Sequence, residues 1–190
     1  MKLLVNATLT AFAAIWVVAG TPPAAAAQTS SSIDLIERAV SAGPMSIRAA
    51  AQVVSFDMQG HPTVLRTGSN GWTCLPYDVG TPTQSPLCLD GAGLAWYTAV
   101  MQGKEPDPTV AGLSYMLVGG SVWSNLNPAA TKPEHGETSY VSVPPHIMIL
   151  SAKLAAQSGL PSGQTRPDTS RPFVLLGGTP FAAIILPIGS

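Results

Sequence analysis

The sequence predicts an α+β domain: a mostly antiparallel sheet with two or three helices packed on it, and one disulfide. Two observations lead to this fold class. Short β-rich segments follow one another through turn-forming residues, which is typical of hairpins. Regular alternation of strands and helices, as in a doubly wound sheet, is missing. The chain also has only two cysteines, Cys74 and Cys88, so at most one intramolecular disulfide can form.

The amino terminus has the pattern of a secretory signal peptide. Lys2 supplies a positive charge, and an apolar run follows from Ala7 to Ala19. This run is too short to span a bilayer, and Ala25–Ala27 fits an A-x-A cleavage site. We therefore expect residues 1–27 to be a signal peptide and residues 28–190 to form a single domain, periplasmic or secreted. A buried amino-terminal helix or an uncleaved anchor is the alternative.

Export to an oxidising compartment favours a disulfide between Cys74 and Cys88. Free thiols or a metal site are the alternatives. The C-x-x-C spacing of thioredoxin-like and zinc-ribbon sites is absent. The bond would join a strand end to the start of a helix.

Three segments are predicted to be helical. Residues 31–42 have apolar side chains at helical spacing and end at Gly43-Pro44. A second, nearly all-apolar helix follows Cys88, with Asp90 as its N-cap and Gly103 as its C-cap. Residues 151–158 form a short third helix. We expect the helices to cover one face of the sheet.

The strands are predicted from β-branched and aromatic runs bounded by turn residues. A long polar loop is expected at 121–139, and such loops often carry function. The predicted strands are residues 49–58, 63–67, 72–75, 112–118, 140–143, 146–150, 173–176 and 181–186.

Charge and motifs exclude several function classes. The chain has 9 basic and 10 acidic residues, and only 10% of it is charged, so it offers no basic surface for nucleic acid. No second apolar stretch reaches membrane-spanning length, so we expect no membrane association after cleavage. The motifs for a P-loop, a dinucleotide site, an α/β-hydrolase elbow, H-E-x-x-H and haem attachment are absent. No cofactor is therefore expected, except that a divalent metal stays open.

His146 is the leading catalytic or metal-binding candidate, because it follows two prolines and begins an apolar strand. It titrates near neutrality and could act as a base, with Asp90 or Glu137 in support. His135 lies in an acidic loop and could share a zinc ion with His146. Met148 lies on the same face of the strand and would permit copper. The simpler interpretation is a strand-end histidine bonded to a carbonyl.

A ligand site is the other possibility. Trp123 and Asn125 lie in the long loop, and Trp72 could join them at one groove. Aromatic and amide groups together can recognise a sugar or another small molecule. Alternatively, these residues serve turn formation and packing.

In order, the segments Trp72–Pro76, Pro86–Asp90, Tyr115–Leu117, Ser124–Pro128 and Pro145–Met148 resemble a group of exported bacterial proteins without assigned function. The resemblance covers about residues 70–187. It implies a bacterial origin and one module, and it carries over no activity, cofactor or catalytic residue.

Two functional hypotheses follow. The first is an exported binding or accessory module whose low charge suits a neutral small molecule or a protein partner. The second is a metal-assisted hydrolase that uses His146. The enzyme would bring His146 to a carboxylate inside a pocket. The binding module would place Trp72, Trp123 and Asn125 around a groove.

Overall fold

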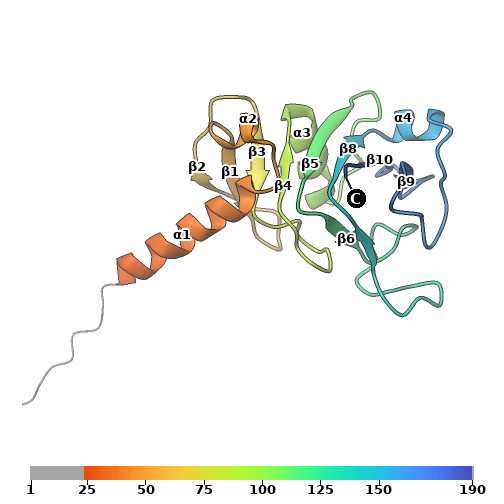
Figure 1. Ribbon diagram of the computed structural model, residues 1–190, viewed down its shortest axis with the longest axis horizontal. Coiled ribbons are helices and arrows are strands. Elements are labelled where there is room, and N and C mark those ends of the chain that lie inside the picture. The colour runs from red at the N-terminus through yellow and green to blue at the C-terminus, as the bar shows by residue number, and fades with distance from the viewer. Residues whose placement is uncertain (1–23, 190) are drawn as a thin grey trace, which may run out of the picture.

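The computed structural model describes residues 24–189 (Figure 1). Most of the predicted signal peptide, residues 1–23, lies outside the described residues. No helix among residues 24–189 is long and apolar enough to cross a membrane. The helices are α1 (Ala24–Val40), α2 (Met45–Arg48), α3 (Gly91–Met101) and α4 (Ala152–Gln157). The strands are β1 (Gln52–Phe56), β2 (Pro62–Arg66), β3 (Thr73–Leu75), β4 (Leu87–Leu89), β5 (Gly112–Met116), β6 (Gly120–Val122), β7 (Val141–Val143), β8 (His146–Leu150), β9 (Phe173–Leu175) and β10 (Ala183–Pro187).

Eight strands form one sheet in the order β2-β1-β3-β4-β5-β8-β10-β9, and β6 pairs with β7 in a small second sheet. Every pairing of the described strands is antiparallel except that of β1 with β3, which is parallel. The fold is α+β, as the sequence predicts. The hairpins β1–β2 and β9–β10 are confirmed.

The disulfide between Cys74 and Cys88 is also confirmed. The two cysteines face each other on β3 and β4, with their Cα atoms 3.9 Å apart. They lie on the sheet face that α1 covers, in a cluster with Ala39, Ala42 and Ile47. The disulfide therefore lies in the core, in the middle of one half of the sheet.

The helices lie on both faces of the sheet, not on one as expected. The carboxyl-terminal part of α1 packs with the disulfide on one face, and in Figure 1 its other end extends away from the sheet. The opposite face packs against Tyr97 and Trp96 of α3. Strand alternation predicts which side chains share a face, but a nearly all-apolar helix such as α3 gives little signal for which face of the sheet it covers.

The long loop is more ordered than its polarity indicates. Its first residues form β6, and β7 returns beside them, so the residues between the two strands form a flap attached to a small sheet. Pro144-Pro145 separates β7 from β8, and the chain changes sheet at that point. This arrangement places the flap over the α3 side of the main sheet.

Candidate ligand-binding cavity

A cavity of about 300 Å³ lies between the main sheet, α3 and the flap. Its floor consists of side chains that point to the α3 face of β4, β8, β9 and β10: Leu87, Leu89, Met148, Leu150, Leu175 and Ala183. Helix α3 forms a wall with Trp96, Tyr97, Val100 and Met101. Its size and apolar lining are typical of small-molecule sites.

The mouth of the cavity is formed by two loops. The exposed lining residues are Gly80, from the β3–β4 connection, and Pro128, Ala129 and Thr131, from the flap. The two loops are bonded together, because the Trp123 indole N–H donates to the carbonyl oxygen of Gly80 at 3.1 Å. The mouth therefore has a defined shape.

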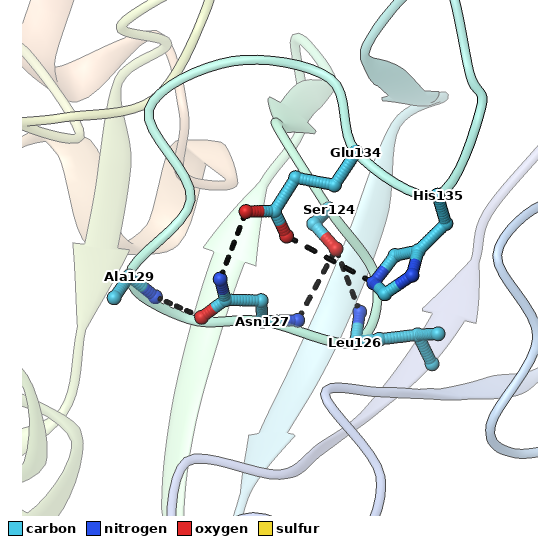
Figure 2. Close-up of polar contacts among 6 residues, drawn as sticks. All are labelled: Ser124, Leu126, Asn127, Ala129, Glu134 and His135. Atoms are coloured by element: carbon cyan, nitrogen blue, oxygen red, sulfur yellow. Dashed lines mark hydrogen bonds and ion pairs between the residues drawn. The ribbon is translucent and has the colours of Figure 1, made fainter.

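The flap is held by its own polar side chains (Figure 2). Ser124 Oγ accepts the backbone N–H groups of Leu126 and Asn127, each at 3.2 Å. Asn127 Nδ2 donates to Glu134 Oε1 at 3.0 Å, and Asn127 Oδ1 accepts the N–H of Ala129 at 2.9 Å. Asn127 lines the cavity. These local hydrogen bonds hold it in position, as the backbone bonds of a helix or strand would do elsewhere.

Two of the lining residues, Asp78 and Tyr97, can ionise. The Tyr97 hydroxyl donates a hydrogen bond to the Asp78 carboxyl group and accepts the N–H of Val79 at 3.1 Å. Burial raises the pKa of Asp78 to about 7 and, together with the Asp78 charge, also raises the pKa of Tyr97. At neutral pH Asp78 is thus a carboxyl group close to its titration point inside an apolar cavity.

The predicted ligand-binding residues do not come together. Trp123 lines the cavity. Trp72 packs against Tyr115, with ring centroids 5.3 Å apart, in the cluster around the disulfide on the opposite sheet face. Asn125 is buried outside the lining, and its Nδ2 donates to the carbonyl oxygen of Gln164 at 2.7 Å. Asn125 therefore ties the flap to residue 164.

His146 is buried outside the cavity lining. Its Nδ1 is 2.7 Å from the carbonyl oxygen of Pro144, which corresponds to the simpler of the two sequence interpretations. Burial lowers the pKa of His146, with the Pro144 contact opposing the shift. The ring is on the same sheet face as Met148, which does line the cavity.

The other enzyme and metal candidates have separate partners. Asp90 is the N-cap of α3, and its Oδ1 accepts the N–H groups of Gly93 at 2.6 Å and Leu113 at 3.0 Å. Glu137 forms an ion pair with Arg166 at 2.6 Å.

His135 Nε2 lies 3.9 Å from Glu134 Oε2 (Figure 2). Among residues 24–189, no three His, Cys, Asp or Glu residues are grouped so that they could hold a metal ion.

Sequence reasoning missed Asp78 and the role of Tyr97 and Trp96. Asp78 lies in a loop rich in Pro, Gly and Thr, where an aspartate usually indicates only a turn. Its backbone does form one, since its carbonyl oxygen accepts from Thr81 Oγ1 at 2.8 Å. The available signal was Trp96-Tyr97, two aromatic residues with polar atoms in an otherwise apolar helix.

Comparison of the chain with protein-family models, curated proteins and solved structures finds no match.

Proposed function

We propose that the protein is an exported binding module that holds a small, mainly apolar molecule in the cavity between α3, the main sheet and the flap. The single observation that carries this proposal is the cavity itself: about 300 Å³, with an apolar floor and a few polar groups at its wall and mouth. Small-molecule sites are typically clefts of about this volume with a mostly apolar lining and a few polar groups, and this cavity has those features.

Export is supported by the amino-terminal sequence pattern and by the disulfide, which persists in oxidising compartments. The hydrolase alternative has less support, because His146 bonds a backbone carbonyl and lies outside the cavity lining. Asp90 and Glu137 are engaged in a helix cap and an ion pair. The binding module is therefore the function that the geometry favours.

The test uses prodan, a neutral apolar fluorophore, and protein purified after expression of the full-length sequence. Val100 lines the cavity from α3, so Val100→Trp fills it, and Ala130→Phe fills it from the flap. Val64→Trp is the matched control, because Val64 is exposed on the edge strand β2. We expect wild type and Val64→Trp to bind prodan, and both cavity-filling variants to lose about tenfold in affinity or more.

Thermal unfolding of each variant distinguishes a filled cavity from a protein that has not folded. If wild type fails to bind prodan, or if folded Val100→Trp and Ala130→Phe bind it as well as wild type does, the proposal is wrong.

A further inference from the structure

We infer that the cavity selects an amphipathic amine, a molecule with an apolar body and one cationic nitrogen, and that Asp78 is the residue that pairs with the cation. This inference rests on the proposed function and names the ligand class for the same cavity. It depends on the charges and aromatic rings that line the cavity and on the hydrogen bonds of Asp78.

The charge of the lining favours a cation. Among the described residues that line the cavity, the Asp78 carboxyl group and the Tyr97 phenol ionise, and none is a Lys, Arg or His. Lys132 follows the last flap residue of the lining but is exposed and outside it. Arg38 bonds the carbonyl oxygens of Pro76 and Gln84 through its guanidinium group. An anionic ligand would thus meet a carboxyl group and no lining cation, whereas a cation would find a partner.

The aromatic side chains also favour a cation. Trp96 and Tyr97 from α3, Trp123 from the start of the flap, and Phe181 all line the cavity. The face of an aromatic ring attracts a cation, most strongly for Trp, and the attraction grows when the cation leaves water. Trp123 is held in place by its bond to Gly80 and by an edge-to-face contact with Tyr140. The same rings provide the apolar surface for the rest of the ligand.

The hydrogen bonds of Asp78 leave it able to accept a ligand. A carboxylate has about four acceptor positions, and the Tyr97 hydroxyl occupies one of them. The Tyr97 oxygen is itself fixed by the N–H of Val79. The Asp78 backbone N–H donates to the carbonyl oxygen of Ser85 at 2.8 Å, which anchors the loop. Asp78 is therefore positioned at the cavity wall before a ligand arrives.

The test compares hexylammonium, 1-hexanol and hexanoate, three ligands with one apolar chain and different head groups. Affinities are measured at about pH 8 by displacement of prodan from the full-length-expressed protein. We expect hexylammonium to bind about tenfold more tightly than 1-hexanol, because a hydrogen bond to a charged group contributes more than a neutral one. Hexanoate should bind most weakly.

Two variants identify the residue. Asp78→Asn keeps the shape of the side chain and removes its charge, so the hexylammonium-to-hexanol affinity ratio should fall to about one. Asp34→Asn removes the same charge from an exposed position on α1, and should keep the wild-type ratio. Circular dichroism of both variants checks that they fold.

A pH series adds a second readout. Hexyltrimethylammonium keeps its charge at every pH, so any change in its affinity reports the protein. The pKa of Asp78 is about 7 in the empty cavity, so most of its carboxyl groups become protonated between about pH 8 and about pH 6. The affinity of the protein for hexyltrimethylammonium should therefore fall roughly tenfold over this range. The Asp78→Asn variant should show no such change.

The outcomes separate the two proposals. If prodan and 1-hexanol bind but hexylammonium has no advantage over 1-hexanol, or keeps it in Asp78→Asn, the amine inference is overturned and the binding module stands. If hexanoate binds as tightly as hexylammonium, the inference is also overturned. If none of the probes binds, the proposed function fails with it.

Discussion

Asp78 combines partial burial in an apolar cavity with a single side-chain partner, the Tyr97 hydroxyl. Its pKa is about 7 in the folded protein and 3.8 in the unfolded chain. Between these values the folded state keeps a proton that the unfolded state has released. The free energy of unfolding therefore falls as pH rises from about 4 to about 7, and the ionised carboxylate destabilises the protein above that range. A residue that destabilises the fold at neutral pH is typical of a functional site.

We predict that Asp78→Asn raises the free energy of unfolding at about pH 8 by an amount on the order of 4 kcal/mol, because the amide carries no charge to bury. At about pH 4 the gain should nearly vanish, since wild-type Asp78 is then protonated in the folded state. Urea denaturation of both proteins at several pH values measures the difference.

The pKa of His146 is lowered, so its contribution has the opposite sign: stability is lost as pH falls below about 6.5. Wild type and Asp78→Asn share this contribution of His146. The difference between their free energies of unfolding therefore isolates the contribution of Asp78. An equal gain at every pH would show that the variant acts through shape and not through charge.

At the scale of elements, α3 meets β5 at unusually close range. A Cβ atom on Gly93 would lie 2.9 Å from the carbonyl oxygen of Leu113, and one on Gly112 would lie 2.4 Å from Gly93 Cα. Asp90 reinforces the contact, because its carboxylate caps α3 and bonds the N–H of Leu113 on β5. The glycines that weaken α3 as an isolated helix thus let it approach the sheet, and this position sets the cavity wall.

Gly91 and Gly93 provide a matched pair of variants in one helix turn. Gly93→Ala should lower the free energy of unfolding by about 1–3 kcal/mol, because the new methyl group meets backbone that cannot move aside. Gly91 has open space around it, so Gly91→Ala should be neutral or stabilise by up to about 1 kcal/mol. Chemical denaturation of the two variants compares them directly. Equal changes in the free energy of unfolding would mean that helix propensity, and not the contact with β5, decides the effect of each variant.

At the scale of the whole molecule, the main sheet joins two halves through the pairing of β5 with β8 (Figure 1). The disulfide lies in the first half, under α1, and the cavity lies on the opposite face, where β4 and the strands of the second half face α3 and the flap. The sheet therefore separates the face that carries the disulfide from the face that holds the cavity.

We predict that the double variant Cys74→Ala/Cys88→Ala loses about 3 kcal/mol of unfolding free energy, because its unfolded chain is no longer closed into a loop of this size. The cysteines are 14 residues apart in sequence. Urea denaturation of the oxidised wild type, the reduced wild type and the variant measures the loss. Reduction should destabilise wild type similarly and leave the variant unchanged. A wild type that is insensitive to reduction would contradict the prediction.

The sequence by itself determined the fold class, the disulfide, the N-cap at Asp90 and most of the strands, because each depends on local patterns. Turn residues mark the hairpins, alternation marks the buried faces, and two cysteines leave one pairing. The strands β4 and β6 were missed because β4 directly precedes α3 and β6 opens the polar loop, so neither stands out as a separate β-rich run between turn residues.

Only the tertiary structure decided which residues meet. Trp72 and Trp123 looked alike in sequence, yet they lie on opposite faces of the sheet. Asp78 looked like an ordinary turn residue, and the fold placed it beside Tyr97 in a cavity. Contacts between residues distant in sequence depend on sheet order and on which face each helix covers, and a nearly all-apolar helix such as α3 carries little local signal for either.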